Sequence, residues 1–139
     1  MKAAAPWVLA LYIAFVFVQS LFFKFSAAEE SIFIFQTIED WSGLPFFEPF
    51  MRNFIGASEL VCSVLLFIPR TQVLGAAGAL LIITGAIFFH LFTPLGVEVA
   101  GDGGELFFLA CGVWVSAILI LFLRRERIPN IFRELGYVS

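Results

Sequence analysis

Charged side chains are scarce in this chain, where Asp, Glu, Lys and Arg make up 14% of 139 residues and hydrophobic residues make up 61%. The mean hydropathy is +1.00. A soluble domain of this size cannot hide so much apolar surface from water. The composition therefore excludes an ordinary soluble protein and predicts an integral membrane protein.

Cysteine and histidine are also rare. Cys62 and Cys111 lie in the middle of two apolar stretches and form no CxxC motif, which gives no support to a thioredoxin-like disulfide mechanism. We interpret both as small packing residues. His90 is the only histidine, and one imidazole among scattered carboxylates is too sparse a ligand set for a metal site. We predict no metal centre and do not expect the chain to be an enzyme on its own.

Long apolar runs occupy most of the chain instead. Four of them approach the roughly 20 residues that a membrane-spanning helix needs, namely residues 6–25, 49–68, 73–95 and 105–123. They leave one longer loop, residues 26–48, with two short connections and a basic tail. The fold class predicted for residues 1–139 is a single all-α membrane domain, a four-transmembrane-helix bundle. Small residues at positions 75, 78, 79 and 85 favour a close approach between helices within the bundle.

The first run resembles a signal peptide in its position. Its apolar part is longer than the usual hydrophobic region of such a peptide, and residues 26–28 match a cleavage site only loosely. We expect this segment to be retained as the first helix of the bundle.

Basic residues indicate the orientation of the bundle. They gather at one end of the four runs, as expected for cytoplasmic loops, which are enriched in Lys and Arg. The residues at this end are Lys2, Arg70, Arg124, Arg125, Arg127 and Arg133. We therefore expect both termini in the cytoplasm, loop 26–48 outside it, and the protein in a bacterial cytoplasmic membrane.

The long loop has a pattern of its own. Glu29 and Glu30 suit the first turn of a helix, an Ile- and Phe-rich run follows, and Trp41 suits the headgroup level of a bilayer. A strand is the competing interpretation, but an isolated strand at a membrane surface would leave its backbone groups unpaired. We predict a short amphipathic interfacial helix that covers the mouth of the bundle.

Each apolar run carries an ionisable residue toward the same, outer end. These residues are Lys24, Glu59, His90 and Glu105, and Arg52 lies on the helical face of Glu59. From a rise of about 1.5 Å per residue, Glu59 lies ~15 Å below the outer end of its span and His90 ~8 Å. Charges in the hydrocarbon region are costly and usually face a bundle interior, a partner or water. We predict that these five residues form a ligand-binding site or a polar core.

Structural roles are the alternatives for the same residues. Lys24 or Arg52 could simply neutralise Glu59, and His90 could be a satisfied hydrogen-bonding partner between helices. Glu105 could be a solvated residue at a helix start. The sequence alone is compatible both with these structural roles and with a ligand-binding site.

Several of these residues resemble a known family. The segment 19–24 (QSLFFK), Arg52 followed by Gly56 and Glu59, and the stretch 85–91 are similar to the DoxX-like membrane proteins. That family consists of small four-helix proteins and is named for a membrane subunit associated with thiosulfate:quinone oxidoreductase. Similar proteins include a component of a redox-stress membrane complex and an animal receptor chaperone.

The resemblance implies that Lys24 and Glu59 form a polar pair to which His90 adds. It suggests a non-catalytic accessory subunit of a quinone-linked membrane redox system, with a quinone-like or lipid molecule bound at an outer-leaflet polar site. An assembly factor for a client membrane protein and a small proton-coupled carrier are the alternatives. The expected partners are the lipid bilayer, a membrane redox complex or client protein, and further copies of the chain as a homo-oligomer. No nucleic acid is expected.

Overall fold

The computed structural model describes residues 4–99 and 101–129, and these residues form helices and connections without any strand. Three of the expected spans and the loop helix appear as continuous α-helices, and the second span begins in a π-helical turn. The elements are α1 (Ala5–Phe25), α2 (Glu29–Ser42), the π-helical turn (Phe47–Met51), α3 (Arg52–Leu66), α4 (Gln72–Phe92), α5 (Glu105–Leu123) and a short 3-10 turn (Arg125–Arg127). The all-helical prediction is confirmed for the described residues.

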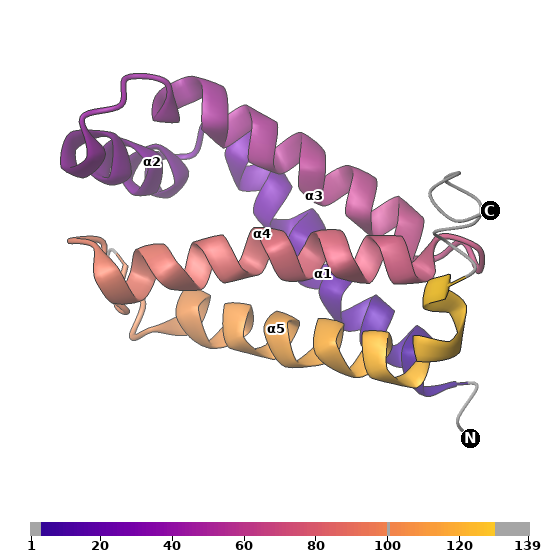
Figure 1. Cartoon of the computed structure of the whole chain (residues 1–139). Coiled ribbons are helices and arrows are strands. Elements are labelled where there is room, and N and C mark those ends of the chain that lie inside the picture. The colour runs from indigo at the N-terminus through magenta and orange to yellow at the C-terminus, as the bar shows by residue number, and fades with distance from the viewer. Residues whose placement is uncertain (1–3, 100, 130–139) are drawn as a thin grey trace.

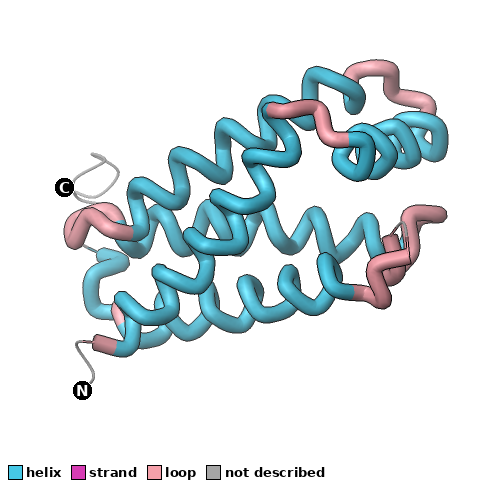
Figure 2. The backbone as a smooth tube through the Cα atoms, turned by 180° about the vertical axis from the view of Figure 1, so that it is seen from behind, coloured by secondary structure: helices cyan, strands magenta, loops and turns pink. Residues whose placement is uncertain are grey.

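The four longer packed helices form a closed bundle. Helix α1 packs against α3 and α5, and α4 packs against the same two helices, so that the order around the bundle is α1, α3, α4, α5. Helix α2 lies across one end of the bundle, against the π-helical turn, while α1 starts and α5 ends at the opposite end (Figure 1). The view from behind shows the same arrangement, with the connections confined to the two ends (Figure 2).

Three helices are long and apolar enough to cross a membrane: α1 and α4 with 21 residues each and α5 with 19. The predicted second span, residues 49–68, is divided between the π-helical turn and α3, which alone has 15 residues. The predicted span 73–95 ends early, at Phe92. Thr93 is extended because it precedes Pro94, whose ring disfavours the helical conformation of the residue before it.

Small residues bring α3 and α4 into backbone contact. A Cβ atom on Gly75 would lie 2.8 Å from the backbone nitrogen of Leu66, and one on Gly78 would lie 2.7 Å from Sγ of Cys62. Cys62 is a buried packing residue, as predicted, and the close approach of the helices at positions 75 and 78 is confirmed. Gly85 differs from them, because its Cβ would have no atom within 4 Å.

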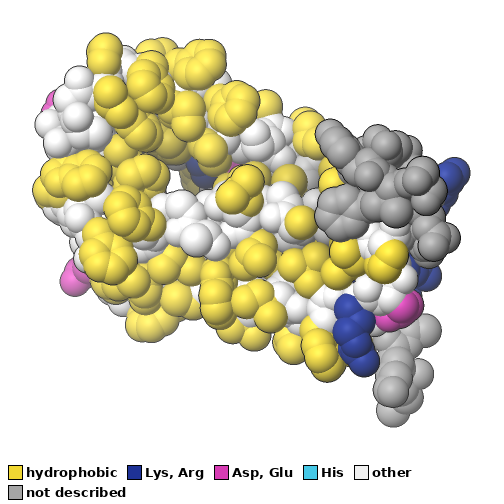
Figure 3. All heavy atoms as spheres, viewed as in Figure 1, with side chains coloured by type: hydrophobic (Ala, Val, Ile, Leu, Met, Phe, Trp, Pro, Cys, Tyr) yellow, Lys and Arg dark blue, Asp and Glu magenta, His cyan; other side chains and the backbone are white. Residues whose placement is uncertain are grey.

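The surface of the bundle is apolar along its length. Hydrophobic side chains cover most of the face seen in Figure 3, and charged groups lie mainly at the ends. Large side chains such as Leu81 and Phe22 are exposed by 77% and 67%. An outer surface of this kind suits lipid rather than water.

A buried polar contact closes the end of the bundle opposite α2. Gln72 is fully buried, and its Nε2 donates to the carbonyl of Leu66 at 3.2 Å while its Oε1 accepts from Nε of Arg124 at 3.0 Å. The Arg124 guanidinium lies 5.9 Å from the ring centroid of Trp7. Side chains thus tie together helices α1, α3 and α4 and the end of α5, and the sequence had indicated only the basic character of Arg124.

Candidate functional site

Lys24 and Glu59 form an ion pair inside the bundle. Nζ of Lys24, in the last turn of α1, lies 3.0 Å from Oε1 of Glu59, and the two side chains are only 12% and 5% exposed. The ammonium group also donates to Oγ of Ser20, one turn earlier on the same helix. Glu59 belongs to the buried face of α3 together with Gly56 and Ser63, as the spacing predicts. Lys24 is therefore the residue that neutralises Glu59.

One oxygen of Glu59 lacks a proper hydrogen bond. Although Oε1 lies 3.0 Å from the ammonium group, it is not in hydrogen-bonding geometry with any donor of residues 4–99 and 101–129. Attraction between the two charges does not depend on that geometry, so the ion pair and the missing hydrogen bond are compatible. A buried acceptor of this kind carries a desolvation penalty that a donor from outside the chain would remove.

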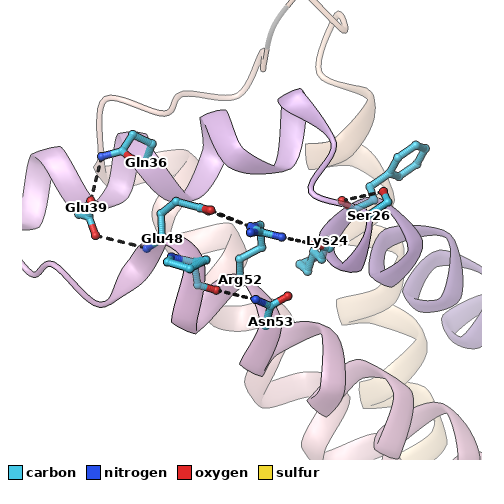
Figure 4. A network of polar contacts seen from close by, with 9 residues as sticks. Lys24, Ser26, Gln36, Glu39, Glu48, Arg52 and Asn53 are labelled. Carbon is cyan, nitrogen blue, oxygen red and sulfur yellow. Dashed lines mark hydrogen bonds and ion pairs between the residues drawn. The ribbon is translucent and has the colours of Figure 1, made fainter.

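Arg52 serves a different pair. Its Nε lies 2.9 Å from Oε2 and 3.0 Å from Oε1 of Glu48, and its Nη1 donates to the backbone carbonyl of Lys24. The interpretation that Arg52 neutralises Glu59 is wrong, because the guanidinium points toward the π-helical turn, as Figure 4 shows. Arg52 does not line the cavity described below.

The Arg52 contacts continue into α2. The backbone nitrogen of Glu48 donates to Oε1 of Glu39 at 3.3 Å, and Nε2 of Gln36 donates to Oε2 of Glu39 at 2.9 Å (Figure 4). This polar chain joins α2, the π-helical turn, α3 and the end of α1. Apolar packing of Phe35, Ile38 and Phe47 accompanies it.

His90 is buried in the last turn of α4. Its Nδ1 lies 2.8 Å from the carbonyl oxygen of Gly96 in the following loop. Because a carbonyl only accepts, Nδ1 carries the hydrogen, and in the neutral imidazole Nε2 is left as an acceptor. The alternative that His90 is a hydrogen-bonding partner between helices thus differs from the structure, in which Nδ1 bonds to the loop that follows α4.

Glu105 is exposed and begins α5, but Asp102 rather than Glu105 organises this helix start. Oδ1 of Asp102 accepts from the backbone nitrogens of Val99 at 3.0 Å and Gly104 at 2.8 Å, and Oδ2 accepts from Leu106 at 3.1 Å. Partial burial opposes ionisation of Asp102, but these three donors and the electrostatic interaction with His90 hold the pKa of its carboxyl below the ordinary value.

One cavity of about 980 Å³ brings four of the five predicted residues together. Lys24, Glu59, His90 and Glu105 all line it, whereas Arg52 lies outside. Most of the lining is apolar, and α2 covers it with Ile34, Phe35 and Ile38. No group of three His, Cys, Asp or Glu residues that could hold a metal ion occurs in the described parts of the chain.

The cavity opens sideways between α3 and α4. Its lining includes the exposed Ala57 and Val61 on α3 and the exposed Leu81 on α4, with Gly85 beside them. Figure 3 shows a hollow between these helices, beside α2, with charged side chains of both signs at its floor. A molecule dissolved in the apolar layer around the bundle can therefore reach the ion pair without passing through water.

The chain matches the model of a known protein family. A model described as the DoxX-like family matches residues 8–111. The chain belongs to the DoxX-like family. The matched segment holds all five predicted site residues of this DoxX-like protein, together with most of α1, all of α2 to α4 and the start of α5. No match is found among curated proteins or among solved structures.

Three features of the site were missed from the sequence. The pair of Glu48 and Arg52 has the i,i+4 spacing of ion pairs on a helix, which was a usable signal. Asp102, just before α5, is a residue type that commonly caps helix starts. The opening beside Gly85 had no sequence signal, because glycine also marks close helix contacts.

Proposed function

We propose that this DoxX-like protein is a non-catalytic accessory subunit of a quinone-linked membrane redox system and holds a quinone-like or lipid molecule. The observation that carries the proposal is the cavity of about 980 Å³, whose apolar wall surrounds the buried pair of Lys24 and Glu59. Small-molecule sites in proteins combine an apolar lining with a few convergent polar groups in this way. A bound polar head would contact the pair, and its apolar tail would lie along the lining.

The proposal includes four membrane spans. The helical residues of the π-helical turn continue into α3, and residues 49–66 together reach about 27 Å at 1.5 Å per residue. That length approaches the ~30 Å hydrocarbon core of a bilayer. An even number of spans agrees with the start of α1 and the end of α5 at one end of the bundle (Figure 1).

The proposed orientation places that end in the cytoplasm, by the positive-inside rule. Arg70, Arg124, Arg125 and Arg127 lie at this end, whereas Lys2 and Arg133 lie outside the described residues. Single cysteines at Asp40 in α2 and at Glu126 after α5, in a background without Cys62 and Cys111, should react with an impermeant maleimide from opposite sides. Labelling of both from the same side would contradict the topology. In this proposal the membrane is the bacterial cytoplasmic membrane.

The first test of the proposal is native mass spectrometry with lipid extraction. Wild type and Glu59→Gln are purified in mild detergent, and Glu98→Gln, at an exposed position outside the cavity, is the matched control. We expect a quinone-sized or lipid adduct on wild type and on the control and its loss from Glu59→Gln.

The contrary result is equally informative. If wild type carries no adduct but a second polypeptide copurifies, an assembly factor explains the protein better. In that case Lys24 and Glu59 hold the bundle together rather than a ligand.

A further inference from the structure

The cavity presents acceptors more than free donors. Oε1 of Glu59 is a buried acceptor that lies 3.0 Å from the Lys24 ammonium but has no hydrogen bond in proper geometry. In the neutral imidazole, Nε2 of His90 is a second acceptor because Nδ1 donates to the carbonyl oxygen of Gly96. Both residues line the cavity, one on α3 and one on α4. The ammonium group of Lys24, the strongest donor there, is already engaged by Ser20 and by the charge of Glu59. A ligand head that donates hydrogen bonds fits this arrangement better than one that only accepts them.

The charges of the cavity also restrict the ligand. Lys24 and Glu59 compensate each other, and Arg52 is compensated outside the cavity by Glu48. The remaining charged residues of the lining, Glu30, Asp102 and Glu105, are acidic. A charged head group next to the buried pair would add an uncompensated charge in an apolar layer, which is costly. The lateral opening between α3 and α4 further favours a molecule that is dissolved in the membrane.

We propose that the cavity selects an uncharged, membrane-dissolved molecule that carries a free hydroxyl group, which donates to Glu59. For a quinone-like ligand this is the reduced, dihydroxy form, whose second hydroxyl group suits His90. The inference rests on the proposed function and deepens it, because it names the chemical form that the site prefers. It concerns binding alone and includes no electron transfer by the chain.

Matched probes test the preference without any mutation. Wild-type protein in phosphatidylcholine nanodiscs is titrated under anaerobic conditions with a long-chain benzoquinol, the corresponding quinone and the dimethyl ether of the quinol. The quinone has nearly the same shape but no hydroxyl hydrogen, and the ether retains the oxygens without donors. Dissociation constants are measured by native mass spectrometry. A 1,2-diacylglycerol and its O-methyl ether form a second pair of probes, which distinguishes a lipid from a quinol as the source of the hydroxyl group.

We expect the hydroxyl form to bind at least about tenfold more tightly than its matched probes, since a hydrogen bond to a charged acceptor contributes on the order of 10- to 100-fold. Glu59→Gln should reduce this ratio, and Glu98→Gln should leave it unchanged. Equal or tighter binding of the quinone and the ethers would overturn the inference while the proposed function stands. If no probe binds and no adduct is extracted, both proposals fail.

Discussion

The contact between α3 and α4 allows a quantitative test of the packing. A Cβ atom on Gly75 would lie 2.8 Å from the backbone nitrogen of Leu66 and 3.0 Å from the backbone oxygen of Cys62. Backbone atoms cannot rotate away, so Gly75→Ala must push the two helices apart. Overpacking of a close-packed core costs about 1–3 kcal/mol. Replacing glycine by alanine inside a helix also gains about 1 kcal/mol in helix propensity, which partly hides this cost.

Gly85→Ala on the same helix is the matched control. It has the same gain in propensity, but no atom lies within 4 Å of its new Cβ. The propensity gain cancels in the comparison, so that Gly75→Ala should be less stable than Gly85→Ala by roughly 1–3 kcal/mol. Reversible unfolding by SDS in mixed micelles, followed by circular dichroism, measures the free energy of unfolding of both variants. Equal stability, or greater stability of Gly75→Ala, would refute the packing that is described here for α3 and α4.

Three further changes test the two ends of the bundle. Arg52→Met leaves the largely buried carboxylate of Glu48 unpaired, so we expect a loss of stability of about 3 kcal/mol and faster amide exchange in α2. Asn53→Ala, at an exposed position, should have neither effect. Asp102 has a lowered pKa, so its contribution to stability is present above the ordinary carboxyl pKa and is lost as pH falls through the lowered value. In thermal unfolding curves measured at decreasing pH, Asp102→Asn should lack this loss of stability. Gln72→Leu removes the acceptor of Arg124 and should cost about 1–3 kcal/mol by SDS titration; unchanged stability would mean that this contact contributes nothing.

Hydrophobic run length predicted the helices well. The run 105–123 coincides with α5, and the acidic start at Glu29 and Glu30 correctly indicated a helix within the long loop. The errors fall where backbone geometry overrides hydropathy. Pro94 is apolar enough to extend the third run but stops α4 at Phe92, and the second run conceals a π-helical turn before Arg52. Hydropathy alone contains no information about either change.

The sequence indicated which residues lie near the candidate site but not which of them form ion pairs. Depth along each span placed Lys24, Glu59 and His90 toward the same end, and in the structure all three line one cavity. The choice between Lys24 and Arg52 as partner of Glu59 could not be made, because both basic side chains reach the same end of the bundle and long side chains can bend either way. The i,i+4 spacing of Glu48 and Arg52 indicates that these two residues pair, which leaves Lys24 as the partner of Glu59.

The separation of the two ion pairs determines what the cavity can accept. If Arg52 also faced Glu59, two basic side chains would share one carboxylate, and the excess positive charge beside Glu59 would attract an anionic head group. Instead Arg52 is held by Glu48 on one side and by the carbonyl of Lys24 on the other, which anchors the end of α1 without adding charge to the cavity. Lys24 then remains the one basic residue that contacts Glu59 among the described residues that line the cavity. The preference for an uncharged ligand therefore depends on a pair outside the cavity, and Glu48 and Arg52 belong to the explanation of the site although they do not line it.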